Sequence, residues 1–367
     1  MPYAISDFRF HNNLPNSQFR VPDSESPGSG KIVRFFLDKN QELSIDRAGT
    51  EVGLVKKIKK EVLTMGLLDG KVIAVTGAGA GIGREEALLC AKEGARVVIN
   101  DLGGARDGSG RDSKVADQVV EEIKKMGGDA VGHYEDISEA SGGDSLIKAG
   151  VDKWGRFDGL VNNAGILRDK MSFNMEDGEW DSVIKVHLRG HFMCARAAAR
   201  YFREHKEQGG AIVNTTSTSG LLGNAGQANY GAAKLGIVGL NNVLALELSR
   251  YNVRVNAIAP MAYTRMTADL KIAEMLKAYQ PEHIAPLVVF LLSDAAKAIN
   301  GQVFGVFGQF VQLYRLPRPV MEWKASGPKW SPSELAEKAA EIQAVIAKVN
   351  WGYMPGTPMP DAQKVKP

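Results

Sequence analysis

Three polar side chains at defined spacings suggest an alcohol or carbonyl redox site. Tyr230 and Lys234 stand four residues apart in a stretch typical of a helix, so both side chains can project from one face. A cation beside Tyr230 favours the phenolate of a group whose unperturbed pKa is about 10, which makes a general base usable near neutral pH. Ser217 follows an apolar run that predicts a buried parallel strand, and its hydroxyl would hold the substrate oxygen while Tyr230 removes the proton.

The spacing of Tyr230 and Lys234 is weak by itself, because any amphipathic helix can carry a core tyrosine and a solvated lysine. The segment that precedes them supplies a context. An apolar strand, 71–75, runs into the glycine-rich turn 76–83 and then into a helical stretch. This order lets a pyrophosphate sit against backbone amides at a helix N-terminus, although a glycine-rich turn can also be a mere tight connection. Cofactor contacts are therefore expected from Gly77, Gly81, Ile82 and Gly83.

Asp101 ends the apolar run 95–100, which reads as the next strand. A carboxylate at this place hydrogen-bonds the hydroxyls of the adenosine ribose and repels the extra phosphate of NADP. We therefore expect NAD. Arg106 and Arg111 lie in the following loop and could serve a 2′-phosphate, but neither is adjacent to Asp101, which could also be an ordinary residue at the end of a strand.

Taken together, these motifs resemble the short-chain dehydrogenases/reductases over roughly residues 68–308. Thr76-Gly77-x-x-x-Gly81-x-Gly83, Asp136-Ile137, Asn162-Asn163-Ala164-Gly165, Ser217 and Tyr230-x-x-x-Lys234 occur in that family's order and at its spacings. The resemblance implies that Asp136 and Ile137 lie against the adenine, and that Asn162, Ala164 and Gly165 support the central strand and the cofactor ribose. It also implies that Lys234 binds the nicotinamide ribose beside Tyr230.

Several short runs look closer to one subgroup of the family, the (3R)-hydroxyacyl-CoA dehydrogenase domain of the peroxisomal type 2 multifunctional enzyme and its bacterial relatives. They are residues 98–104, 162–169, 186–190 and 226–230. This resemblance implies oxidation of a 3-hydroxyacyl-CoA to its 3-keto product, as in the β-oxidation of fatty acids. A hydroxysteroid or other bulky alcohol is the alternative substrate, because the three catalytic side chains say nothing about its far end.

Two positions depart from the wider family. Most members carry a catalytic asparagine at the position where this chain, like the subgroup, has His187. Either ring nitrogen of a histidine can hold a water. A histidine satisfied within its helix is the alternative. Met261 follows Pro260 where a glycine is usual, so its side chain could narrow the substrate mouth.

The basic residues Arg168, Lys170, Arg189 and Arg265 are expected near that mouth and favour a substrate on a phosphate-bearing carrier. A rival of another class is a non-catalytic binding or scaffold subunit that keeps the fold, with residues 1–66 as a partner-binding arm. The intact catalytic side chains argue against it.

The alternation of apolar strands and helices predicts an α/β fold, a doubly wound Rossmann sheet of seven parallel strands at 67–308. Residues 1–66 form an N-terminal extension, with a linker-like composition, a hairpin of 32–37 with 42–45, and a helix at 50–64. Residues 309–367 form a C-terminal extension with one amphipathic helix, which begins at the N-cap Ser331 with the capping-box residue Glu334 and carries an apolar stripe from Leu335 to Val349.

The composition sets further limits. A net charge of +3 over 367 residues is too small to indicate nucleic-acid binding, and no apolar run approaches the ~18 residues of a membrane span. Cys90 and Cys194 read as buried thiols of a reducing compartment, so the cytoplasm is the expected location. No metal is expected. Family members commonly associate through helices that correspond to 178–206 and 227–250, which implies a homodimer or homotetramer.

Overall fold

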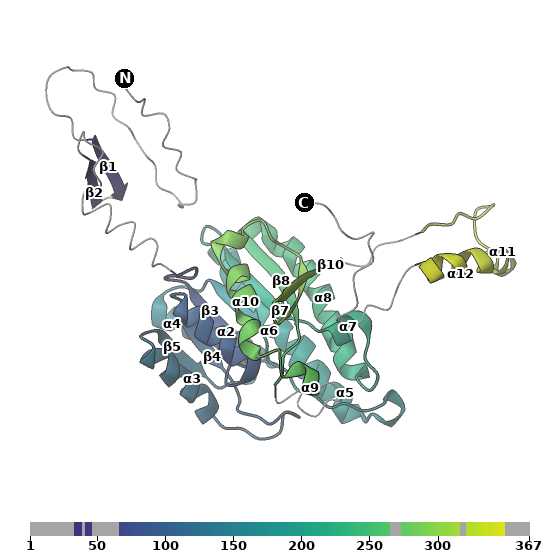
Figure 1. Cartoon of the computed structure of the whole chain (residues 1–367), viewed down its shortest axis with the longest axis horizontal. Coiled ribbons are helices and arrows are strands. Elements are labelled where there is room, and N and C mark those ends of the chain that lie inside the picture. The colour runs from purple at the N-terminus through teal and green to yellow at the C-terminus, as the bar shows by residue number, and fades with distance from the viewer. Residues whose placement is uncertain (1–32, 39–40, 46–65, 265–272, 316–320, 349–367) are drawn as a thin grey trace, which may run out of the picture. The chain divides into compact units, whose positions relative to one another are not determined.

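The computed structural model describes residues 33–38, 41–45, 66–264, 273–315 and 321–348 (Figure 1). The chain separates into two compact units, Met1–Met65 and Gly66–Pro367. In the first unit, β1 (Val33–Asp38) and β2 (Gln41–Ile45) pair antiparallel, with Val33 opposite Ile45, so the predicted hairpin forms. The helix predicted at 50–64 lies outside the described residues.

The second unit is built on a sheet of eight strands in the order β10-β9-β8-β7-β6-β3-β4-β5. Seven of them run parallel, as predicted. The eighth strand, β10, was not predicted and pairs antiparallel with β9. The chain reverses at Gly308, where a φ of 50° suits glycine, so the extension predicted to begin at residue 309 adds an edge strand. The strands are β3 (Val72–Thr76), β4 (Arg96–Asn100), β5 (Asp129–His133), β6 (Gly159–Asn162), β7 (Gly210–Thr215), β8 (Val253–Pro260), β9 (Val303–Phe307) and β10 (Phe310–Tyr314).

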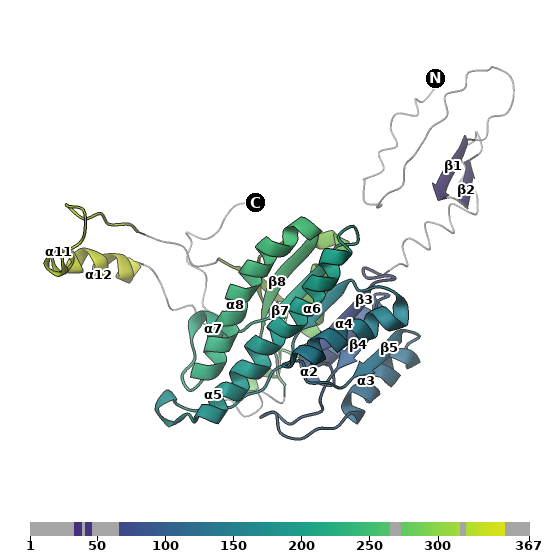
Figure 2. The same ribbon diagram turned by 180° about the vertical axis from the view of Figure 1, so that it is seen from behind.

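Two layers of helices cover the sheet because alternate side chains of each strand point to opposite faces. Ile73 and Val75 of β3 join the core beneath α2, α3 and α10, whereas Val72 and Ala74 join the core beneath α4, α6 and α8. Figures 1 and 2 show these two layers from opposite sides. The helices are α2 (Gly81–Lys92), α3 (Lys114–Lys125), α4 (Ala140–Trp154), α5 (Asp177–Ile184), α6 (Gly190–Glu204), α7 (Thr218–Leu222), α8 (Ala228–Leu248), α9 (Ala273–Leu276) and α10 (Ala285–Leu292).

The stretch predicted as one long helix at 178–206 contains an irregular turn. A π-helical turn, η3 (Lys185–Arg189), joins α5 to α6. Such turns insert one residue into a helix and often lie at functional sites, because they re-aim the side chains they carry. His187 lies on this turn.

Among the described residues, one helix, Ala228–Tyr251, is long and apolar enough to cross a membrane by length and composition alone. It consists of α8 and the short turn that follows it. Its inner face packs on the sheet, where Leu244, Ala245 and Leu248 are buried in the core. Packing on the sheet therefore accounts for the apolar residues of its inner face.

The C-terminal extension forms two short helices instead of the one predicted, α11 (Pro332–Glu337) and α12 (Ala339–Lys348), with a break at Lys338. Ser331 is the N-cap, and its hydroxyl accepts a hydrogen bond from the Glu334 backbone N–H at 3.1 Å. The Glu334 carboxylate accepts from the backbone N–H of Ser326 instead of closing the predicted capping box. Leu335, expected in a buried stripe, is 44% exposed. Val349 lies outside the described residues.

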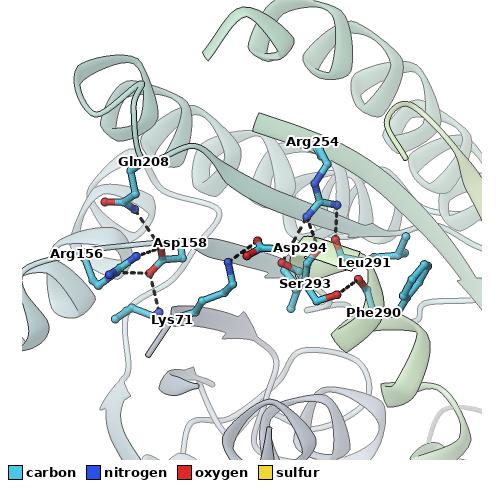
Figure 3. Close-up of polar contacts among 11 residues, drawn as sticks. Lys71, Arg156, Asp158, Gln208, Arg254, Phe290, Leu291, Ser293 and Asp294 are labelled. Atoms are coloured by element: carbon cyan, nitrogen blue, oxygen red, sulfur yellow. Dashed lines mark hydrogen bonds and ion pairs between the residues drawn. The ribbon is translucent and has the colours of Figure 1, made fainter. Parts of the chain in front are cut away.

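A cavity of about 360 Å³ lies at the amino ends of the strands, and Figure 3 shows the charged side chains around it. The Asp158 carboxylate accepts from the first backbone N–H of β3 and, through both oxygens, from the guanidinium of Arg156, at 2.7–2.8 Å. Arg254 donates to carbonyl oxygens at the end of α10, and Lys71 pairs with Asp294 at 2.8 Å. These bonds tie the beginnings of several strands together.

Candidate active site

Ser217 lies at the carboxyl end of β7, where its hydroxyl is the N-cap of α7 and accepts from the Ser219 backbone N–H at 3.1 Å. Its side chain is 8% exposed, so a substrate oxygen could still reach the hydroxyl. The same hydroxyl donates toward Tyr230 and lowers the pKa of that phenol. The strand and the capped turn therefore fix the serine facing the tyrosine.

Tyr230 lies in the first turn of α8, and Asn229 holds that turn in place. The Asn229 side chain accepts from the Tyr230 backbone N–H at 2.7 Å and donates to the carbonyl oxygens of Arg168 and Glu179. Burial raises the pKa of Tyr230 to about 12, an effect larger than the lowering by Ser217. The phenolate that the sequence suggested near neutral pH is therefore disfavoured in the chain by itself.

Lys234 is buried one turn further along α8 and is only 2% exposed. Its Nζ donates to the carbonyl oxygen of Thr215 at 2.7 Å and lies 5.5 Å from the centroid of the Tyr230 ring. Burial lowers the pKa of Lys234 to about 7, because the charged ammonium form loses favourable hydration there. A cation that loses its proton near neutral pH is a weaker promoter of the Tyr230 phenolate than the sequence analysis assumed.

His187 is buried against the edge of Tyr230, with ring centroids 5.1 Å apart and planes nearly perpendicular. Its Nε2 faces the backbone of Ile166, at 3.0 Å from the nitrogen and 2.8 Å from the oxygen. Burial and the charge of Lys234 hold the pKa of His187 well below its usual range, so the ring is neutral at neutral pH. A Cβ on Gly165 would lie 2.2 Å from the ring, so only glycine fits opposite this histidine.

Unpartnered polar atoms gather behind these residues. The Asn162 amide donates to the side chain of Asn214 at 3.0 Å, and Asn214 donates in turn to Asn241 at 3.3 Å. These links leave several buried atoms with no hydrogen-bond partner among the described residues: Asn162 Oδ1, His187 Nδ1, Thr215 Oγ1, Asn241 Nδ2 and both ring nitrogens of His191. Buried polar atoms of this kind are usually satisfied by water or a ligand.

The glycine-rich turn between β3 and α2 has the shape needed for a dinucleotide. Gly77 has a φ of 63°, and a Cβ there would lie 2.7 Å from the backbone of Ala164. A Cβ on Gly83 would lie 2.4 Å from Asn163, so both glycines allow internal packing. A Cβ on Gly81 would come no closer than 3.8 Å to any atom, so this glycine leaves the N-terminus of α2 open. No side chain caps α2, and its first amides are available to a pyrophosphate.

Asp101 lies beside this turn, as the sequence predicted. One carboxylate oxygen accepts from the backbone N–H of Gly79 at 2.8 Å, and the other accepts from Gly103 at 2.7 Å. Each oxygen of a carboxylate can accept a second bond, so these contacts aim the group and still leave capacity for ribose hydroxyls. The Asp101 carboxylate is therefore available to the adenosine ribose of a dinucleotide bound at this turn.

The other residues expected at the cofactor occupy different environments. The Asp136 carboxylate accepts from the backbone and hydroxyl of Ser138, whereas the Ile137 side chain is buried against Gly190. Asn162 is buried at the end of β6, and the Ala164 backbone N–H donates to the Thr76 hydroxyl. Their contacts with adenine and ribose stay predictions.

Three of the basic residues expected near the substrate mouth have acidic or backbone partners instead. Lys170 pairs with Glu179 at 2.8 Å, and Arg189 donates to the carbonyl oxygen of Ser138. Arg168 donates to the loop after β4, and Arg265 lies outside the described residues. Met261 is partly buried after β8. The case for a phosphate-bearing carrier from these side chains is thus weaker than the sequence suggested.

The sequence analysis assigned no role to four side chains that organise the site. The Thr76 hydroxyl accepts from the backbone N–H groups of Asn163 and Ala164, and the Asn163 amide donates to the carbonyl oxygens of Thr76 and Gly77. Gln227 and Asp169 form a hydrogen bond beside the start of α8. The available signal was position for three of them, since Thr76 and Asn163 lie at or just after a strand end and Gln227 lies just before α8.

Comparison with known proteins agrees with this geometry. The chain matches the family described as short chain dehydrogenase over residues 71–274. It is 52% identical over 246 residues to a short-chain type dehydrogenase/reductase of Mycobacterium tuberculosis, which covers 67% of this chain and 85% of that protein. A crystal structure of a short chain dehydrogenase from Mycobacterium avium matches with a TM-score of 0.68 at 42% identity, and the match covers 76% of this chain and 96% of that one.

Two relatives have more specific names. Hydroxyacyl-CoA dehydrogenase ChsB1 of Mycobacterium tuberculosis is 46% identical over 280 residues, which covers 73% of this chain and 87% of that protein. Peroxisomal multifunctional enzyme type 2 of Mus musculus is 45% identical over 250 residues, which covers 68% of this chain and 33% of the mouse enzyme. The chain thus spans about a third of the mouse relative's length.

Proposed function

We propose that this chain, an oxidoreductase that belongs to the short-chain dehydrogenase family, oxidises the 3-hydroxyl of an acyl-CoA thioester with NAD as the hydride acceptor. The observation that carries the proposal is the meeting of Ser217, Tyr230 and Lys234 at the carboxyl ends of the strands, next to an open glycine turn. The relative named hydroxyacyl-CoA dehydrogenase, 46% identical over most of its length, supports the substrate class.

In the proposed reaction, the alcohol carbon loses a hydride and the alcohol oxygen loses a proton. Ser217 donates to the substrate oxygen, and the Tyr230 phenolate accepts the hydroxyl proton as the hydride leaves the carbon. NAD, when bound, supplies the hydride acceptor and a positive charge. Because burial raises the pKa of Tyr230 to about 12, the base depends on positive charge nearby, which protonated Lys234 also supplies.

The proposed choice of NAD depends on Asp101. A carboxylate that is already aimed by Gly79 and Gly103 would face the 2′-phosphate of NADP at close range, where like charges repel by more than they do in bulk water. We expect wild type to prefer NAD in kcat/KM, and Asp101→Ala to narrow that preference by about tenfold. A preference of the wild type for NADP would contradict this assignment. Asp107→Ala, in the loop that follows, is the control and should leave the preference unchanged.

The alternative substrate is a hydroxysteroid or other bulky alcohol. It is favoured because Lys170 and Arg189 already contact other groups of this chain. Two cations that could bind a carrier phosphate are therefore occupied. NAD reduction across a panel of 3-hydroxyacyl-CoAs and hydroxysteroids separates the two. The proposal requires the acyl-CoAs to give the higher kcat/KM, and a panel led by steroids would overturn it.

The proposed assembly is a homodimer or homotetramer formed through α8 and α6. Ala195, Ala197 and Ala198 of α6 are buried within their own subunit and so do not supply the contact surface. The support comes from α8 instead, whose outer face exposes Leu235, Val243 and Leu246, the last by 80%. Light scattering should give an oligomer that survives deletion of residues 1–66 and dissociates in Leu246→Glu. An intact oligomer in Leu246→Glu would exclude this face, and dissociation on the deletion would make the N-terminal extension an assembly arm.

A further inference from the structure

The three segments expected to bind the dinucleotide leave neighbouring strands at one level of the sheet. β3, β4 and β5 lie side by side, and their last residues, Thr76, Asn100 and His133, stand opposite one another in the strand register. The glycine turn begins after the first of them and Asp101 comes directly after the second. The pair expected at the adenine lies within four residues of the third. The end of β4 is therefore placed to fix all three segments.

Asn100 contacts each of these segments. Its carbonyl oxygen accepts from the Ala78 backbone N–H of the glycine turn at 2.9 Å. Its side-chain amide donates to the Glu135 carbonyl oxygen at 3.1 Å, and the amide nitrogen lies 3.0 Å from Nδ1 of His133 and 3.4 Å from the carbonyl oxygen of that residue. The same His133 carbonyl accepts from the Asp101 backbone N–H at 3.2 Å. Asn100 and His133 are both buried, so these bonds are shielded from water.

These contacts fix the direction of the hydrogen bonds of the His133 ring. The amide nitrogen of Asn100 faces two carbonyl oxygens, which can only accept, so it is also the donor toward Nδ1. The ring proton then sits on Nε2, which donates to the Ser145 hydroxyl at 2.8 Å, and that hydroxyl can donate to the Glu135 carboxylate at 3.1 Å. Burial lowers the pKa of His133 despite the nearby Glu135, which favours this neutral ring. A neutral imidazole is the form that accepts at one nitrogen and donates at the other.

The network lies behind the groups expected to contact the cofactor. Groups that bind a ligand must be held close to their productive geometry, so a buried support behind them affects affinity. From this arrangement, and on the premise of the proposed function, we propose that Asn100 and His133 are positioning residues for the adenosine half of NAD. They set Asp101 and the adenine segment relative to the glycine turn.

The test uses two replacements of His133 that separate hydrogen bonding from size. His133→Asn places an oxygen close to the position of Nδ1 and keeps an acceptor for Asn100, although the side chain is smaller. His133→Gln is closer to histidine in volume, but its polar atoms lie one bond further out and the amide loses that acceptor. We expect the dissociation constant of NAD, measured by calorimetric titration, to rise about tenfold in His133→Gln and to stay within about threefold of wild type in His133→Asn.

Two further measurements confine the effect to the adenosine half. The dissociation constant of ADP-ribose, which lacks the nicotinamide, should change by the same factor as that of NAD in each variant. The kcat at saturating NAD should stay within about twofold, because Ser217 follows β7, which β6 and β3 separate from β4. Tyr134→Phe is the matched control. Tyr134 is the neighbour of His133, but its hydroxyl donates to Asp117 at the surface, so both dissociation constants should be unchanged.

The outcomes separate positioning from packing. A purely structural role would lower the free energy of unfolding more in the smaller variant, His133→Asn, and leave both dissociation constants unchanged. Equal dissociation constants in the two variants, or a larger loss of affinity in His133→Asn, would overturn the positioning role. The proposed function would still stand if the wild type reduced NAD with a 3-hydroxyacyl-CoA. A wild type that bound neither NAD nor ADP-ribose would overturn both.

Discussion

The two ends of the same parallel sheet treat buried polar groups in opposite ways. At the amino ends, the charged groups are hydrogen bonded within the chain: Asp158 accepts from a backbone N–H and a guanidinium, and Arg254 caps α10 (Figure 3). At the carboxyl ends, Lys234 has one backbone acceptor, while His187 Nδ1 and Thr215 Oγ1 have no partner among the described residues. One end holds the strands together, and the other keeps hydrogen-bonding capacity for molecules that bind there.

This difference has an energetic side. A buried donor or acceptor without a partner costs roughly 1–3 kcal/mol, whereas a satisfied network costs little and resists being broken. The polar groups at the carboxyl end therefore depend on a cofactor, a substrate or water for their hydrogen bonds. Substitutions at the two ends should separate activity from stability.

The largest separation is expected from Lys234→Met. This change removes the buried cation beside Tyr230, so kcat should fall by about 10²-fold and NAD should bind more weakly, while the free energy of unfolding stays the same or rises. Stopped-flow turnover, cofactor titration and urea unfolding provide the three values. Lys71→Met, at the opposite end, is the control and should keep kcat within twofold. Equal losses of kcat in both variants would show that the ends do not differ as we describe.

Asp158→Ala should give the reverse pattern. It leaves a backbone N–H of β3 and the guanidinium of Arg156 without their acceptor, and we expect the free energy of unfolding to fall by about 3 kcal/mol. Asp294→Ala, which removes an exposed partner of Lys71, should cost less than about 1 kcal/mol. Urea unfolding measures both, and kcat of the folded enzyme should be unchanged. A loss of kcat without a loss of stability in Asp158→Ala would place chemistry at the amino end.

Glu86 gives a further test, because it should make the free energy of unfolding depend on pH. This residue of α2 is fully buried, its carboxyl oxygens have no partner among the described residues, and burial raises its pKa from 4.5 to about 8. The folded chain therefore keeps a proton that the unfolded chain releases, so this contribution to stability is complete below about pH 4.5 and is lost as pH rises toward 8. Relative to wild type, Glu86→Gln should gain on the order of 3 kcal/mol in unfolding free energy between pH 5 and pH 8.

The measurement for Glu86 is urea unfolding of both proteins across that pH range. Glu85→Gln, a neighbour that pairs with Arg84 at the surface of the helix, is the matched control and should follow the wild-type curve. Parallel curves for Glu86→Gln and wild type would mean that Glu86 is ionised and solvated in the folded chain.

The sequence predicted the fold and the placement of Tyr230 and Lys234 on one helix because both depend on local patterns. Apolar runs such as 72–76 and 96–100, each followed by a helical stretch, indicate buried strands, and the spacing of Tyr230 and Lys234 specifies one helix face. The expected family and its relation to hydroxyacyl-CoA dehydrogenases were confirmed by the comparisons. These features need no knowledge of how distant segments pack.

The features that the sequence did not predict depend on contacts between distant segments. Phe310–Tyr314 is a strand because β9 offers it a free edge, and the π turn at His187 accompanies the packing of the ring against Gly165 and Ile166. The pKa of Lys234 follows from complete burial, which its place in a four-residue spacing does not reveal. The predicted N-cap at Ser331 forms, but the predicted capping box does not, because the Glu334 carboxylate accepts from the backbone N–H of Ser326 instead.

The most direct test of the redox site at the carboxyl ends of the strands is single-turnover oxidation of a 3-hydroxyacyl-CoA by Tyr230→Phe. The variant keeps the ring that packs against His187 and loses only the phenolic oxygen that we propose takes the proton. We predict that the rate of NAD reduction falls by about 10²-fold or more, while the dissociation constant of NAD stays within twofold of wild type. A rate within a few-fold of wild type would contradict the assignment of Tyr230 as the base.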